Sequence, residues 1–156
     1  MDVSMIFGII FALILIGALL AFGLPLIEKY IKIGIDSEVL KTIDNLQKKV
    51  DEIYRLAENS AEEFKLSFPK DYKLCFFNSS DPKKHYSAGW DPDSTTLYRI
   101  NQSRYNVWYY SGDDDARGDG KAIPYLDIPT EKNFCVPGGS KVYVTKRWSG
   151  VSIEKI

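Results

Sequence analysis

The chain lacks most of the residues and motifs on which catalytic and nucleic-acid-binding sites are built. Its 156 residues include one histidine and two cysteines. A catalytic triad must therefore use His85, and no motif surrounds that residue. Glycine-rich phosphate loops and closely paired cysteines are absent. The formal net charge is −1 and there is no polybasic run, which excludes nucleic-acid binding through phosphate neutralisation. We therefore predict a non-enzymatic protein with no catalytic residue, no cofactor and no nucleic-acid partner.

Charge is also missing from a long stretch near the N-terminus. Every position from Met5 to Ile27 is uncharged, although 26% of the chain is charged. At about 1.5 Å per residue, a helix over this stretch crosses a hydrocarbon core of roughly 30 Å. A cleaved secretory signal ending near Ala21-Phe22-Gly23 is the alternative, but no Lys or Arg precedes the run and the run exceeds the usual signal core. We predict a single-pass membrane helix, with residues 1–34 as the anchor and its junction.

The side of the membrane on which the remaining residues lie depends on two opposing signals. Lys29 and Lys32 follow the span, and by the positive-inside rule they place the following residues in the cytoplasm. Cys75 and Cys135 argue the opposite, because two cysteines far apart in strand-like segments are typical of a structural disulfide in an oxidising compartment. Such a bond stabilises a fold by about 4 kcal/mol on the chain-entropy model. Two buried free thiols are the alternative for this pair.

Two sequence triplets have the form of N-glycosylation acceptors. They begin at Asn78 and Asn101, and both are placed in polar turns next to predicted strands. Chance occurrence is the simpler alternative for each. The strand-like segments are also rich in aromatics, a composition typical of exterior β domains. Together with the cysteines, these features predict a cell-membrane protein whose head is extracytoplasmic.

Glycine and proline, which most often interrupt helices, are missing from residues 35–68. We therefore predict a continuous amphipathic helix over 35–68. An apolar stripe runs along it at spacings of four and three, and opposed charges occupy the other face. The stripe consists of Val39, Ile43, Leu46, Val50, Ile53, Ala57, Ser60 and Phe64. We expect the stripe to pack on the head, and the membrane half to self-associate where Gly8, Gly17 and Gly23 allow close approach.

From residue 69 to the end, short strand-like segments and turns replace the helical pattern. The predicted strands are 72–77, 96–100, 106–110, 133–136, 141–147 and 151–155. Residues 137–139 and 148–150 are predicted turns, the second joining the last two strands. We predict that residues 69–156 form an antiparallel sheet wrapped on the helix, which gives an α+β fold.

Two clusters in the head are candidate binding sites. Asp113, Asp115 and Asp119 lie in an acidic loop that offers oxygens to calcium, but the spacing does not match an EF-hand and a solvated hairpin tip is favoured. Trp90 and Trp108, with Tyr109 and Tyr110, are candidates for a sugar-stacking surface. Aromatics at strand spacing are more often core residues, and we favour that interpretation.

The order of these segments resembles the type IV pilin-like proteins of archaea. The matching features are the uncharged helix with Leu24-Pro25-Leu26, the helix over 35–68, and a head that contains Cys75 and Cys135 and ends in a hairpin over 141–156. The resemblance implies an N-terminal transmembrane helix that continues into an amphipathic helix packed on a small antiparallel β head. It also implies a surface subunit in filament or envelope assembly, with the lipid bilayer and other copies or surface proteins as partners. The alternatives are an anchored module that binds glycan or another envelope component, and an accessory subunit of a larger membrane complex.

Overall fold

The computed structural model of the chain describes residues 3–78, 94–112, 118–129 and 133–156. It has an α+β fold. The elements in chain order are α1 (Val3–Tyr54), β1 (Ala61–Lys65), β2 (Tyr72–Phe76), α2 (Ser94–Ser103), β3 (Val107–Ser111), β4 (Asp119–Lys121), β5 (Phe134–Pro137), β6 (Lys141–Lys146) and β7 (Val151–Lys155). The chain divides into two compact units, Met1–Ser37 and Glu38–Ile156. We call the second unit the head.

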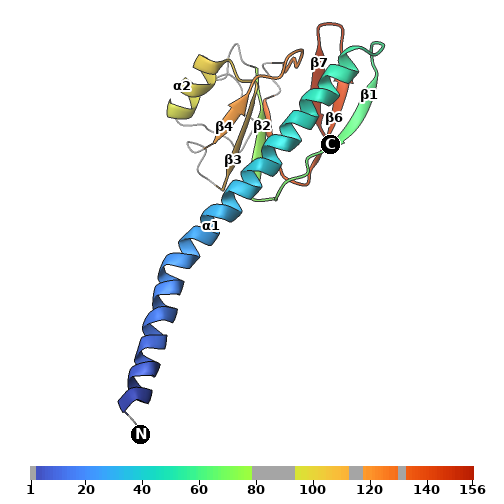
Figure 1. The fold of residues 1–156 in the computed structure, drawn as a ribbon. Coiled ribbons are helices and arrows are strands. Elements are labelled where there is room, and N and C mark those ends of the chain that lie inside the picture. The colour runs from blue at the N-terminus through green and yellow to red at the C-terminus, as the bar shows by residue number, and fades with distance from the viewer. Residues whose placement is uncertain (1–2, 79–93, 113–117, 130–132) are drawn as a thin grey trace. The chain divides into compact units, whose positions relative to one another are not determined.

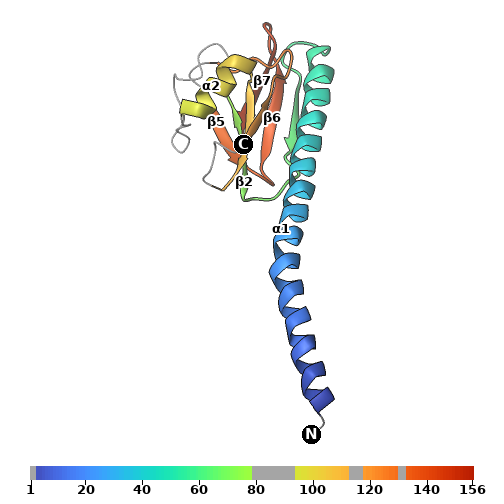
Figure 2. The ribbon, with the colours of Figure 1, turned by 60° about the vertical axis from the view of Figure 1, so that its left-hand side comes forward.

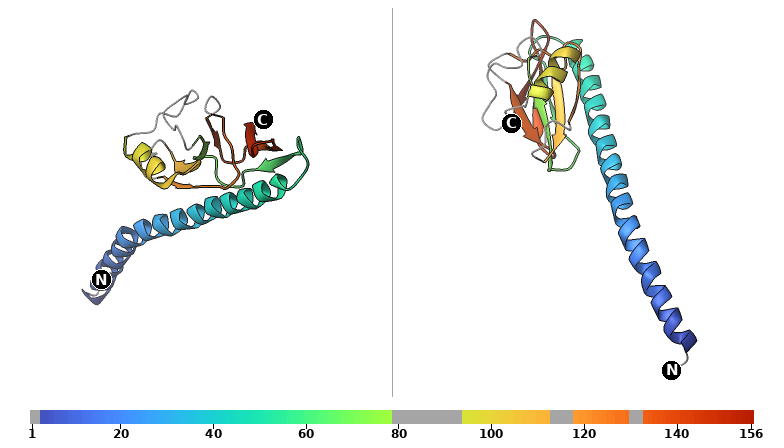
Figure 3. Two further views of the ribbon diagram at one scale, coloured as in Figure 1. Left: turned by 90° about the horizontal axis from the view of Figure 1, so that it is seen from above. Right: turned by 90° about the vertical axis from the view of Figure 1, so that its left-hand side faces the viewer.

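Within the head, α1 supplies one apolar stripe to the core. Val39, Ile43, Leu46, Val50 and Ile53 are fully buried, at the positions that the helical spacing predicts. Figures 1 and 3 show this part of α1 running along both groups of strands. An apolar helix face has to be covered by another layer, and in the head the sheets cover it.

Helix α1 ends at Tyr54, so the predicted helix over 35–68 is too long. The N–H of Leu56 bonds to the carbonyl of Ile53, and Asn59 then adopts a left-handed backbone with φ 67°. Residues 61–65 form β1, whose Ala61 pairs with Thr145 of β6. The absence of glycine and proline permits a helix but does not require one. Pairing with β6 satisfies the same backbone groups, and Asn tolerates the left-handed turn between the two elements.

The head contains two antiparallel sheets where one was predicted. Their strand orders are β1-β6-β7 and β4-β3-β2-β5. One parallel bridge, between Leu126 and Val151, links the segment after β4 to β7. Figure 2 shows β2 and β5 of one sheet near β6 and β7 of the other. Strands β2, β3, β5, β6 and β7 lie close to their predicted positions.

Helix α2, beside the larger sheet, and strand β4 within it differ from the sequence prediction. The segment 96–100, predicted as a strand, lies in helix α2, where Thr96 and Ile100 are the buried positions. The preference of threonine and tyrosine for strands depends on their context. Thr96 and Ile100 are four residues apart and therefore lie on the same side of a helix, which is the buried side of α2. Strand β4 was not predicted, because its sequence Asp-Gly-Lys has low strand propensity and the strand forms by pairing with β3.

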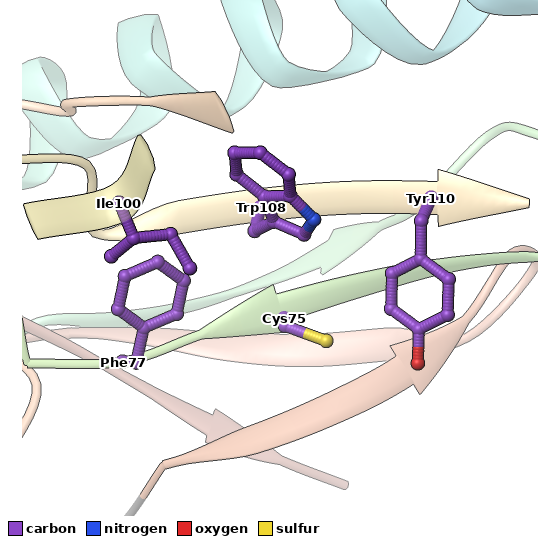
Figure 4. Close-up of a cluster of buried hydrophobic side chains, with 5 residues drawn as sticks. All are labelled: Cys75, Phe77, Ile100, Trp108 and Tyr110. Atoms are coloured by element: carbon purple, nitrogen blue, oxygen red, sulfur yellow. The ribbon is translucent and has the colours of Figure 1, made fainter. Parts of the chain in front are cut away.

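The four-stranded sheet buries both faces. Phe76 pairs with Val107, and Leu74 pairs with Val136, on one face. Lys121, paired with Val107, reaches Asp44 of α1, so this face lies toward α1. The opposite face carries the cluster in Figure 4, which comprises Cys75, Phe77, Ile100, Trp108 and Tyr110. Helix α2 therefore covers the side of this sheet that α1 does not.

Candidate functional site

The first unit presents a continuous apolar surface on α1. Its large apolar side chains between Phe7 and Ile27 are each about half to three quarters exposed, and we call them the anchor surface. They are Phe7, Ile9, Ile10, Phe11, Leu13, Ile14, Leu15, Ile16, Leu19, Leu20, Phe22, Leu24, Leu26 and Ile27. No part of the span Phe7–Leu24 is buried, and it is long and apolar enough to cross a membrane. A signal sequence near the N-terminus has the same properties.

The anchor surface surrounds the helix, whereas the buried stripe of the head occupies one side of it. Ala12, Gly17 and Ala18 are exposed together with the large residues. A Cβ atom added at Gly8, Gly17 or Gly23 would meet no atom within 4 Å. Among the residues that the structure describes, none covers this part of α1. In water each large apolar side chain left exposed forgoes about 1.5–3 kcal/mol, so exposure of this surface to water is unfavourable.

Cys75 and Cys135 are bonded to each other, as the sequence analysis expected. They occupy directly paired positions on neighbouring strands β2 and β5, with Cα atoms 4.0 Å apart. Cys75 is fully buried in the cluster beneath α2, and Cys135 packs against the same cluster. The bond closes a loop with a sequence separation of 60 and contributes about 4 kcal/mol on the chain-entropy model.

The two candidate glycosylation residues have different surroundings. Asn101 is exposed on α2. Asn78 is half-buried, and its Nδ2 donates a hydrogen bond to the carbonyl of Ile128 over 2.9 Å. Its backbone N–H donates to Oδ1 of the buried Asn133. These two hydrogen bonds give Asn78 a structural role in the head. Asn101 is the more accessible acceptor.

The acidic loop lies mostly outside the described residues, and Asp113 and Asp115 fall in that part. Asp119 lies in β4. Its Oδ1 accepts a hydrogen bond from the N–H of Gly120 over 2.8 Å and lies 3.6 Å from Arg99 of α2. Within the described ranges, no group of three or more acidic, histidine or cysteine side chains is placed to hold a metal ion.

The candidate sugar-stacking residues on β3 belong to the core. Trp108 is fully buried, and Tyr109 and Tyr110 are nearly so. The guanidinium of Arg99 lies over the Trp108 ring, 4.9 Å from its centroid. Trp90 lies outside the described residues. The interpretation of the β3 aromatics as core residues is correct, and Trp108 offers no open face to a sugar.

Exposed ion pairs join α1 and the strands of the smaller sheet. Lys49 Nζ lies 2.7 Å from Glu62 of β1 and 2.9 Å from Glu52 of α1, and hydrogen bonds to these carboxylates raise the pKa of Lys49 above 10.5. On β6, a hydrogen bond from Lys141 to Glu63 raises the pKa of Lys141 in the same way. These pairs link α1 to β1 and β1 to β6.

One group of side chains at the C-terminal end of α1 was not predicted from the sequence. Tyr54 stacks on Tyr125 with ring centroids 4.0 Å apart, and Lys146 Nζ lies 4.1 Å from the centroid of the Tyr54 ring. Trp148 projects from the nearby turn between β6 and β7 and is 88% exposed. The residues come from three separate segments, so only the exposed position of Trp148 in a turn was visible in the sequence.

Comparison of the chain with protein-family models, with curated proteins and with solved structures finds no match.

Proposed function

We propose that this protein is a non-enzymatic, membrane-anchored surface subunit with a pilin-like architecture that acts in filament or envelope assembly. The observation that carries the proposal is the contrast between the two apolar parts of α1. The stripe from Val39 to Ile53 is fully covered by the sheets of the head, whereas no residue that the structure describes covers the anchor surface. Lipid, or the helices of other copies in lipid, supplies that cover.

The disulfide supports a head on the extracytoplasmic side. Disulfides persist in oxidising compartments, and this one lies in the core of the head, where it contributes a large share of a small domain's stability. Lys29 and Lys32 favour the opposite orientation through the positive-inside rule. The bonded and buried cysteine pair outweighs them because a bond inside the core has to form as the head folds.

The proposal is tested in intact cells that produce the full chain with a C-terminal epitope and a photoreactive residue at position 19. We expect added protease to remove the epitope without lysis. We also expect illumination to crosslink the chain to further copies or to other membrane proteins, because Leu19 lies on the anchor surface. The matched control carries the photoreactive residue at position 143, where Tyr143 is exposed on β6, and should give fewer crosslinks from the membrane.

Three results would contradict this assignment. Digestion of the epitope only after lysis would place the head in the cytoplasm and favour the accessory-subunit alternative. An intact mass that lacks the residues before about position 23 would identify a cleaved signal. Equal crosslinking from positions 19 and 143 would show that association does not take place specifically through the anchor surface.

A further inference from the structure

The turn between β6 and β7 carries an aromatic side chain that the fold does not require. The N–H of Arg147 bonds to the carbonyl of Gly150 over 2.8 Å, and the N–H of Gly150 bonds back over 3.2 Å, so Trp148 and Ser149 form a two-residue turn. Such turns favour small or polar residues. Trp148 is 88% exposed and adds little to the packing of the head. Figures 1 and 2 show this turn beside the C-terminal end of α1.

Tyr125 lies against the same hairpin and has an unusual backbone. Its φ is 62°, in the left-handed region that a tyrosine rarely adopts. The carbonyl of Tyr125 accepts a hydrogen bond from Val151 over 2.8 Å. A Cβ atom at Gly150 would lie 2.7 Å from that carbonyl oxygen, so only glycine lets the two segments approach this closely. Strained residues held by their surroundings are typical of ligand-binding positions.

Asn106 fixes the segment that carries Tyr125. Its Nδ2 donates to the carbonyl of Ile123 over 2.9 Å, and its Oδ1 accepts from the N–H of Ile123 over 2.8 Å. The same Nδ2 lies 3.4 Å from the carbonyl of Leu126. Tyr125 is therefore held on both sides, and its position is set before any ligand arrives. Preorganisation of this kind reduces the entropy lost on binding.

The rings of Tyr54 and Tyr125 and the ammonium group of Lys146 lie against one another. Tyr125 stacks on Tyr54 with an interplanar angle of 13°, and Lys146 Nζ lies over the Tyr54 ring. Tyr125 remains 53% exposed, because the stack with Tyr54 covers only one of its faces. Among the described residues, Lys146 forms no ion pair with a carboxylate. We call Tyr54, Tyr125, Lys146 and Trp148 the aromatic platform.

We propose that the aromatic platform binds an acidic polysaccharide. Sugar rings present flat C–H faces that stack on the open faces of Tyr125 and Trp148, and the ammonium of Lys146 complements a carboxylate on the polymer. Small ligands favour concave pockets, whereas exposed rings on a turn suit an extended chain laid across them. Weak single sites of this kind gain avidity when many copies are displayed together.

The test uses the full chain in detergent micelles and electrophoresis through gels that contain hyaluronan or polygalacturonate, with dextran as the neutral polymer. We expect both acidic polymers to retard the protein and dextran to leave its mobility unchanged. Trp148→Ala should weaken retardation about five- to ten-fold, which corresponds to the loss of one stacking contact. Its unfolding temperature should not change, because the indole is exposed. Tyr98→Ala on α2, where Tyr98 is 66% exposed, is the matched control and should behave like the wild type.

Four results would overturn the inference. The first two are the absence of retardation by either acidic polymer and equal retardation by dextran. The third is an equal loss of retardation in Trp148→Ala and Tyr98→Ala. The fourth is crosslinking of a photoreactive residue at position 148 chiefly to protein. Failure here leaves the proposal of a membrane-anchored subunit intact, since the platform and the anchor surface share no residue.

Discussion

At the scale of single residues, Asn106 is the polar group on which the head depends most clearly. It is buried, its side-chain amide pairs with both backbone groups of Ile123, and its own carbonyl accepts the N–H of Phe77 over 3.1 Å. Through its side chain and its backbone, Asn106 thus joins the residue after β2, the start of β3 and the segment after β4. A buried amide with its partners satisfied specifies one arrangement, because any other leaves polar groups unpaired.

Replacing Asn106 by alanine removes that arrangement. Asn106→Ala leaves the N–H and the carbonyl of Ile123 without their side-chain partner, and we expect unfolding of the full chain in detergent micelles to become easier by about 2 kcal/mol. Denaturant unfolding followed by tryptophan fluorescence measures the change. Asn101→Ala on the exposed side of α2 is the matched control and should shift stability by less than about 0.5 kcal/mol. A similar decrease in the free energy of unfolding in both variants would show that the hydrogen bonds of Asn106 do not stabilise the head.

At the scale of elements, residues 61–65 form strand β1 and contact α1, whereas the sequence predicts that they continue the helix. Lys49 of α1 bonds to Glu62 of β1, and Oγ1 of Thr42 donates to the carbonyl of Ser67 over 3.1 Å. Position 62 is adjacent to Lys49 only because the chain reverses after Tyr54. The pair is partly exposed, so its contribution is modest, about 0.5 kcal/mol.

This pair gives a pH dependence whose sign follows from the pKa of Lys49. Because Glu62 and Glu52 raise that pKa above 10.5, the stabilisation is fully present below pH 10.5 and is lost as the pH rises through the value in the folded chain. We expect Lys49→Met to be less stable than the wild type at pH 8 and to approach it as the pH rises through the raised pKa of Lys49. Thermal unfolding of the full chain in micelles across this range measures the difference.

Lys48→Met is the control for this measurement, since Lys48 is an exposed neighbour on the same helix. Its stability at pH 8 should differ from that of the wild type by less than about 0.5 kcal/mol. A difference between wild type and Lys49→Met that stays constant as the pH rises well past 10.5 would exclude the ion pair as the cause.

At the scale of the whole molecule, two units with different solvent requirements share one helix. The first unit exposes apolar side chains, whereas the head, from Glu38 on, has its own buried core and its own disulfide. Removal of residues 1–37 should therefore leave a chain that stays monomeric without detergent and unfolds cooperatively, while the full chain aggregates when detergent is removed. Analytical ultracentrifugation and thermal unfolding measure both properties. Aggregation of the shortened chain would mean that a second large apolar surface lies on the head.

The sequence by itself determined the features that depend on local pattern. The uncharged run predicts the exposed apolar helix, the spacing of Val39, Ile43, Leu46, Val50 and Ile53 predicts the buried stripe, and alternation predicts most of the strands. The two cysteines were expected to pair, and they do. Such features can be read from the sequence because periodicity is set by neighbours along the chain.

Tertiary structure alone decided the features that depend on distant partners. The helix ends at Tyr54 because residues 61–65 pair with β6, and Asp119–Lys121 form a strand because β3 pairs with them. The aromatic platform exists only where the end of α1, the segment around Tyr125 and the β6–β7 hairpin meet. Local propensities differ by about 1 kcal/mol or less per residue, so pairing and burial against remote segments override them.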